Sequence, residues 1–209
     1  MAVLLFDFDG VIADTLPGEI KYFLPICKEM GLGISSAQDL KDLCNDNVFS
    51  SIQKLGISLP LYFEAYNKFY ETLNKKKYIA KPYPGMIEFL KETTLKNAVY
   101  IVTSNLYKFP ADMFSKYDIT GIKGILSGDM ESSKTKKINS IKEQYPNEKI
   151  CFITDTKGDV LEARKSTADV IIAVTWGWHS KEVLETANAD IMIDSVFELK
   201  EYIECFYYF

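Results

Sequence analysis

Two aspartates, Asp7 and Asp9, stand two residues apart at the end of an apolar run that begins at Val3. In an extended strand, residues i and i+2 point the same way, so both side chains can face one pocket. Two neighbouring carboxylates repel each other, and the pKa of one rises unless a cation lies between them. Gly10 permits a sharp turn beside them. The pair therefore either binds a hard divalent cation, which prefers oxygen ligands, or simply caps a turn.

A polar triplet follows a second apolar run. Thr103, Ser104 and Asn105 come directly after residues 98–102. Their hydroxyl, amide and backbone N–H groups can bind an anion. The same residue types also commonly end strands and begin helices, so the triplet alone does not decide between these roles.

Two further carboxylates and a lysine complete the candidate residues. Asp155 follows the apolar run 149–153, and Asp159 lies four residues further on. Asp159 suits the N-cap of a helix, whereas capping explains Asp155 less easily. Lys134 opens an expected helix close to the same edge, with Lys136 and Lys137 as alternatives for its role.

The elements around these residues predict an α/β fold. Apolar runs expected to be strands alternate with helical patterns, which favours a parallel sheet with helices on both faces. Strands are expected at 3–8, 98–102, 122–126, 149–153, 170–174 and 191–193, and helices at 86–96, 134–145 and 160–166 and at the C-terminus. Ligands bind at the carboxyl ends of such strands, so the polar residues should converge on one edge.

Residues 17–77 show helical periodicity and no strand pattern. Pro25 should strain or kink the first of these helices, and Ser35 or Ser36 should cap the second. The stiff stretch Lys81–Gly85 then marks a hinge. We therefore expect an α/β core domain at residues 1–15 and 82–209, with a small all-helical domain at 16–81.

Composition narrows the functional class. The chain has 209 residues, a net charge of −5 and a pI near 5.1, which disfavours non-specific nucleic-acid binding. Its four cysteines form no C-x-x-C pair, and its N-terminus resembles neither a signal peptide nor a membrane span. We expect a cytoplasmic monomer or homodimer with no membrane partner, a packing or surface role for His179, and core packing or an oligomer contact for residues 206–209.

Together these elements resemble the haloacid dehalogenase superfamily, in its phosphatase branch. The stretch from Asp7 to Thr15 resembles the first motif of that family, and Thr103 the second. Lys134 resembles the third motif, and Asp155 with Asp159 the fourth. Two residues depart from the usual pattern: Thr154 stands where many relatives have glycine, and Thr135 where proline is frequent.

The resemblance implies a Rossmann-like core with a helical cap, and a role for each motif. Asp7 would attack phosphorus, and Asp9 would protonate the leaving oxygen and later activate water. Mg²⁺ would be held by Asp7, Asp155 and the backbone carbonyl of Asp9, with Asp159 orienting these groups. The phosphate-binding residues implied are Gly10, Thr103, Ser104, Asn105 and Lys134.

Three alternatives stay open beside a phosphatase of a small phosphorylated metabolite. A sugar phosphomutase of the same family uses the same aspartyl-phosphate, but it usually needs a second phosphate site built around arginine. The only arginine here is Arg164, outside the helical segment. The others are a phosphoacceptor of the response-regulator type, for which the chain is too long, and a non-catalytic binding module.

Overall fold

The computed structural model of the protein describes residues 2–205. At its centre, six strands form a parallel sheet in the order β5-β4-β1-β6-β7-β8. The strands are β1 (Val3–Phe6), β4 (Ala98–Val102), β5 (Ile122–Leu126), β6 (Ile150–Thr154), β7 (Val170–Val174) and β8 (Ile191–Ile193). The central strands β1, β4 and β6 are buried along their whole length, as expected of parallel strands covered on both faces.

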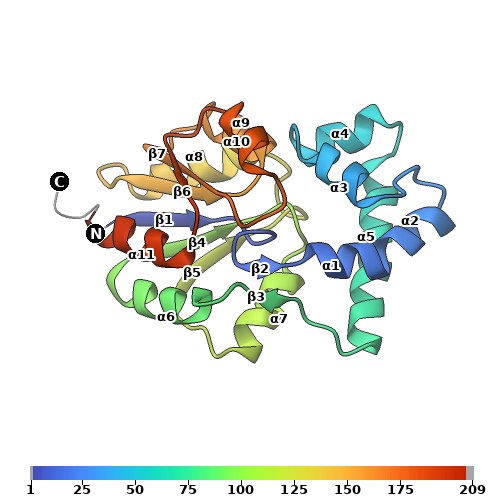
Figure 1. Ribbon diagram of the computed structural model, residues 1–209, viewed down its shortest axis with the longest axis horizontal. Coiled ribbons are helices and arrows are strands. Elements are labelled where there is room, and N and C mark those ends of the chain that lie inside the picture. The colour runs from blue at the N-terminus through green and yellow to red at the C-terminus, as the bar shows by residue number, and fades with distance from the viewer. Residues whose placement is uncertain (1, 206–209) are drawn as a thin grey trace.

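Helices cover both faces of this sheet (Figure 1). Helices α6 (Met86–Lys96), α7 (Lys108–Lys116) and α11 (Val196–Cys205) pack on one face, and α8 (Lys134–Gln144), α9 (Lys157–Ala163) and α10 (Lys181–Glu185) on the other. Successive residues of β1 serve opposite faces, because Leu4 belongs to the first cluster and Leu5 to the second. The predicted α/β class with helices on both faces is confirmed.

The helices between β2 (Ala13–Asp14) and β3 (Lys81–Pro82) form a block at one end of the molecule (Figure 1). They are α1 (Leu16–Gly18), the π-helical segment η1 (Glu19–Phe23), α2 (Leu24–Glu29), α3 (Ala37–Leu43), α4 (Val48–Lys54) and α5 (Leu59–Lys75). We call residues 16–75 the helical block. A separate hydrophobic cluster forms mainly from this block and includes Trp178 from outside it. In this cluster Phe23 lies 5.4 Å from Phe69 and 4.5 Å from Tyr66 between ring centroids.

Local signals explain two features of this block. Pro25 lies within the continuous helical stretch formed by α1, η1 and α2, directly after the π-helical turn of η1. Ser36 caps α3 by accepting from the backbone N–H of Asp39, whose side chain in turn accepts from the N–H of Ser36. The irregular turn before Pro25 agrees with the expected strain or kink, and the cap at Ser36 is as expected.

The chain enters and leaves the helical block through a short antiparallel pair. The strands β2 (Ala13–Asp14) and β3 (Lys81–Pro82) pair Ala13 with Pro82 and Asp14 with Lys81. Two-residue strands carry no periodicity, so the sequence did not indicate them. Residues 81 and 82, which belong to the predicted hinge at Lys81–Gly85, form one strand of this pair.

Some expected boundaries were wrong. The first strand ends at Phe6 and not at residue 8, because the carbonyl of Phe8 accepts from the N–H groups of Ile12 and Ala13 and turns the chain back. Helix α9 begins at Lys157 and not at residue 160, and α7 and α10 were not predicted. The aromatic stretch 206–209 lies outside the described residues. No helix within residues 2–205 combines the length and apolarity that crossing a membrane requires.

Candidate active site

The polar residues predicted from the sequence converge at the carboxyl edge of the sheet. Asp7 directly follows β1, Thr103 follows β4, and Asp155 follows β6. These three strands are neighbours, with β1 between β4 and β6. The first turn of α8 brings Lys134 to the same edge.

The ammonium group of Lys134 joins two carboxylates in a buried cluster. Its Nζ lies 2.7 Å from Oδ2 of Asp7 and 2.6 Å from Oδ2 of Asp159. Burial lowers the pKa of Lys134, but the charges of Asp159 and Asp7 outweigh it and raise the pKa above its ordinary value. Burial raises the pKa of Asp7 well above its ordinary value, although Lys134 opposes this. The lysine therefore stays charged and neutralises part of the acidic cluster.

The three lysines that the sequence could not separate have different places. Lys134 alone of the three contacts Asp7. Lys136 is exposed, with its Nζ 3.7 Å from Glu131. The buried Lys137 donates to the backbone carbonyl of Thr103 at 2.7 Å. The geometry favours Lys134 for the phosphate, while Lys137 supports the loop after β4.

The triplet after β4 contacts Asp9. The side-chain amide of Asn105 donates to both carboxylate oxygens of Asp9, at 3.1 and 3.2 Å, and the hydroxyl of Thr103 to one of them at 3.4 Å. The same hydroxyl accepts from the backbone N–H of Asn105 at 3.0 Å. Burial raises the pKa of Asp9, and the bond from Asn105 opposes that rise. The triplet thus orients Asp9, a role that the sequence had not assigned to Asn105.

Asp155 has one satisfied and one unsatisfied oxygen. Its Oδ2 accepts from the backbone N–H of Trp178 at 2.7 Å, whereas its buried Oδ1 has no partner among the described residues. Burial raises the pKa of Asp155 to about 7. Gly10, at φ +73°, and Gly177 pack directly on this carboxyl, and a Cβ at either position would overlap it. Gly10, expected at the phosphate, lies beside Asp155.

Asp159 does not cap α9, so the capping alternative is wrong. Thr156 occupies the N-cap position, and the Oδ2 of Asp159 accepts from Lys134 and, at 2.9 Å, from the hydroxyl of Thr154. The threonine that replaces the family's usual glycine therefore orients Asp159. The charge of Lys134 lowers the pKa of Asp159 despite its burial.

Comparison with known proteins agrees with this arrangement. The sequence model of the family described as haloacid dehalogenase-like hydrolases matches residues 4–173. The chain belongs to this family. It is 20% identical over 205 residues to a phosphoglycolate phosphatase of Synechococcus elongatus, with 95% of each chain covered. It is 23% identical over 222 residues to one of Vibrio parahaemolyticus, with 96% of this chain and 95% of the relative covered.

A solved structure shares the fold along the whole chain. A "predicted phosphatase" from Clostridium acetobutylicum superposes with a TM-score of 0.79 at 22% identity, covering 97% of this chain and 98% of that one. The shared fold includes the helical block, because nearly all of both chains is covered.

The donor set of this haloacid dehalogenase-like hydrolase fits a magnesium ion. Within residues 2–205, no three histidine, cysteine, aspartate or glutamate side chains are grouped so that they could hold a metal by themselves. Mg²⁺ needs fewer than three such side chains, because it keeps several water ligands and is commonly bound through one or two carboxylates. Asp7 and Asp155, with the backbone carbonyl of Asp9, would supply such a set. The unpaired Oδ1 of Asp155 is a buried acceptor that a cation would satisfy.

The helical block contributes residues that the sequence did not single out. A cavity of about 60 Å³ lies over Asp7 and is also lined by Glu19, Tyr62 and Tyr66. Glu19 is only 1% exposed, and burial, with the nearby charge of Asp9, raises its pKa to about 8. A lone glutamate near a helix start usually faces water, so no signal in the sequence marked it as buried.

His179 connects the helical block to the start of α9. Its Nδ1 accepts from the backbone N–H of Lys157 at 3.0 Å, and its Nε2 lies 2.9 Å from the backbone carbonyl of Lys41. Nδ1 is therefore the acceptor nitrogen, and Nε2 carries the proton and donates. Burial lowers the pKa of His179, so the ring is neutral. This position agrees with the packing role expected from the sequence.

Proposed function

We propose that this hydrolase is a Mg²⁺-dependent phosphatase that cleaves a small phosphorylated metabolite through an aspartyl-phosphate on Asp7. The observation that carries the proposal is the ion-paired cluster of Lys134 with Asp7 and Asp159 beside Asp9 and the unpaired oxygen of Asp155. The family supports hydrolysis as the reaction type. The names of the two phosphatase relatives support a phosphate ester as the substrate.

Each reaction step uses a group at the sheet edge. A carboxylate oxygen of Asp7 forms a bond to phosphorus as the bond to the leaving oxygen breaks. Asp9 gives that oxygen its proton and is left as a carboxylate. It then takes a proton from the water that attacks phosphorus. The bond between Asp7 and phosphorus breaks, phosphate leaves, and both aspartates return to their first state.

Other groups would hold the phosphate and balance its charge. Lys134, the backbone N–H of Ser104 and the hydroxyl of Thr103 would donate to the non-bridging oxygens. Asp7, Asp155 and the carbonyl of Asp9 would hold Mg²⁺, which when bound supplies positive charge between the nucleophile and the phosphate. Asp159 would keep Lys134 in place through their 2.6 Å contact.

Residues 16–81 would act as a cap domain on a core formed by residues 1–15 and 82–209. The cavity over Asp7 is lined from both parts, so closure of the cap would separate the site from bulk water. Residues 16–81 contain no arginine. Arg164 lies in the core, where it pairs with Asp190 at 2.7 Å. The absence of a second arginine-based phosphate site favours a phosphatase over a phosphomutase.

The decisive experiment combines chelation with replacement of the nucleophile. Purified protein with Mg²⁺ should release phosphate from p-nitrophenyl phosphate over many turnovers without a bisphosphate activator, and excess EDTA should stop it. Asp7→Asn should lower kcat by at least about 1000-fold, because an amide is not a nucleophile. Circular dichroism should show the variant folded.

Trapping adds a test of the mechanism itself. Asp9→Asn should accumulate phosphoenzyme with p-nitrophenyl phosphate, since that leaving group needs little acid help while water activation is lost. Mass spectrometry should place the phosphoryl group on Asp7. A phosphoryl group on another residue, or full activity in excess EDTA, contradicts the proposal. Phosphate release that stops at one turnover while a sugar phosphate isomer accumulates would indicate a phosphomutase.

A further inference from the structure

Glu19 presents a buried, unsatisfied oxygen where the leaving group would lie. It is the first residue of η1 and lines both the cavity over Asp7 and an adjoining cavity of about 40 Å³. One oxygen accepts from the hydroxyl of Tyr66 at 2.9 Å. The other, Oε2, is buried and has no partner within the described part of the chain. An unpaired buried carboxyl oxygen is costly, so a ligand group that satisfies it gains affinity.

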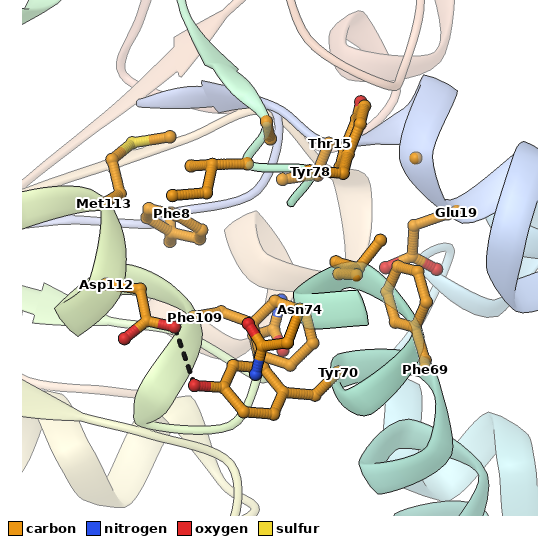
Figure 2. Close-up of a pocket in the computed structure, with 15 residues that line it drawn as sticks. Phe8, Thr15, Glu19, Phe69, Tyr70, Asn74, Tyr78, Phe109, Asp112 and Met113 are labelled. Atoms are coloured by element: carbon orange, nitrogen blue, oxygen red, sulfur yellow. Dashed lines mark hydrogen bonds between the residues drawn. The ribbon is translucent and has the colours of Figure 1, made fainter. Parts of the chain in front are cut away.

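The adjoining cavity lies between the helical block and the sheet body, by which we mean the six-stranded sheet and the helices on its two faces. Figure 2 shows Glu19 and Phe69 on the side of the helical block, with Phe8 and Met113 opposite them. The carboxyl of Glu19 points into the space beside the ring of Phe69. Asp9 and Glu19 both line the cavity over Asp7, so a leaving group bound at Asp9 can extend toward Glu19.

The charges around both cavities are almost entirely negative. The acidic residues lining the cavity over Asp7 are Asp7, Asp9, Glu19, Asp46 and Asp159. Lys134 is the one basic residue among the lining residues described, and it already pairs with Asp7 and Asp159. The adjoining cavity is lined by Glu19 and Asp112 with no described lysine, arginine or histidine. A carboxylate on the leaving group would meet no free cation in either cavity.

We propose that Glu19 selects substrates whose leaving group carries a hydroxyl or an ammonium group, and that the acidic lining of both cavities, to which Glu19 belongs, rejects a leaving-group carboxylate. This inference rests on the proposed phosphatase function and assigns the substrate class of the same site. A hydroxyl suits Oε2 in either protonation state, since it both donates and accepts. An ammonium group adds charge pairing with the acidic lining. Phosphoglycolate, named for the two phosphatase relatives, carries a carboxylate on its leaving group and is predicted to be a poor substrate here.

The test compares leaving groups on the wild-type protein with Mg²⁺. We would measure kcat/KM for glycerol 1-phosphate, phosphoethanolamine and phosphoglycolate, with p-nitrophenyl phosphate as the reference. At least one of the first two should exceed phosphoglycolate by about tenfold or more, because an unpaired charge in a buried site is strongly rejected. A higher kcat/KM for glycerol 1-phosphate identifies the donor as a hydroxyl, and a higher value for phosphoethanolamine identifies it as an ammonium group.

Two variants separate Glu19 from general effects on the cap. Glu19→Gln keeps the shape but removes the acid, and it should reduce the preference over phosphoglycolate by at least about fivefold. Glu71→Gln makes the same change at an exposed site on α5 and should leave the preference unaltered. Thermal unfolding checks that both variants fold. If Glu19→Gln does not fold, the wild-type ranking alone decides the inference.

The outcomes distinguish this inference from the function on which it rests. Turnover of p-nitrophenyl phosphate with phosphoglycolate as the best of the three other substrates would overturn the role of Glu19 and leave the phosphatase intact. An unchanged preference in a folded Glu19→Gln variant would overturn it as well. No turnover of any phosphate ester would overturn the proposed function and the inference together.

Discussion

At the scale of single residues, one ammonium group holds the acidic cluster together. Lys134 is buried between Asp7 and Asp159, and each contact is shorter than 3 Å. Removing one partner of a buried ion pair leaves the other charge unpaired. Lys136, two residues along the same helix, is exposed and pairs loosely with Glu131. The two lysines thus form a matched pair for a test.

Lys134→Met should lower kcat by at least about 100-fold, because the phosphate loses its buried cation. It should also lower the free energy of unfolding by about 3–5 kcal/mol, since two buried carboxylates lose their partner. Lys136→Met should change neither quantity measurably. Steady-state phosphate release and urea unfolding provide the two measurements. Normal turnover by a folded Lys134→Met variant would show that another group binds the phosphate.

At the scale of elements, the start of α9 is where the helical block meets the sheet body. The backbone N–H of Gly158 donates to the carbonyl of Cys44 at 2.9 Å, and a Cβ at Gly158 would overlap the carbonyl of Asp46. Asn47 adds a bond from its side chain to Glu162 at 2.7 Å. These contacts and His179 place the α3–α4 loop directly on the first turn of α9. The contact between the helical block and α9 therefore depends on a close approach of their two backbones.

Gly158→Ala should weaken this closure and leave the sheet body intact. Alanine suits a helix better than glycine, so any loss must come from the contact with Asp46. We expect kcat/KM for p-nitrophenyl phosphate to fall by about tenfold, because a site that closes less often is less populated in its active form. Lys157→Ala, which keeps its backbone bond to His179, is the control. Wild-type kinetics in Gly158→Ala would mean that this contact does not limit closure.

At the scale of the whole molecule, stability should depend on pH through Lys137. Burial and the neighbouring charge of Lys134 lower its pKa from 10.5 to about 7. Between these values the unfolded chain binds a proton that the folded chain does not. Stability from this group therefore rises as pH increases from about 7 to about 10.5, by at most about 1.4 kcal/mol per pH unit.

Lys137→Met should remove this dependence. In urea unfolding at pH 7, 8 and 9, the stability of the wild type relative to Lys137→Met should increase with pH. Lys136→Met, whose side chain is exposed, should follow the wild-type curve. Parallel curves for the wild type and Lys137→Met would mean that Lys137 is charged in the folded protein throughout this range.

The sequence predicted the sheet better than it predicted the connections. The strands at residues 98–102, 122–126, 170–174 and 191–193 lie where the apolar runs indicated. Helix α7 was missed although Pro110 lies in its first turn, where a helix tolerates proline, and Met113 and Phe114 give it a buried face. Contacts between distant segments also leave no local signal. The burial of Glu19 beside Tyr66 is one such contact, and the three adjacent lysines could be separated only by the direction that each takes from α8.

The antiparallel pairing of β2 and β3 has a consequence for how such a molecule can diversify. Ala13 lies opposite Pro82 and Asp14 opposite Lys81, so the segment between them begins and ends at one point. Paired strands are only about 5 Å apart, a gap that a tight turn spans. The whole segment can therefore be shortened, lengthened or replaced by an unrelated one without breaking a hydrogen bond of the six-stranded sheet. Evolution can exchange the helical block while it inherits the polar groups at the sheet edge unchanged.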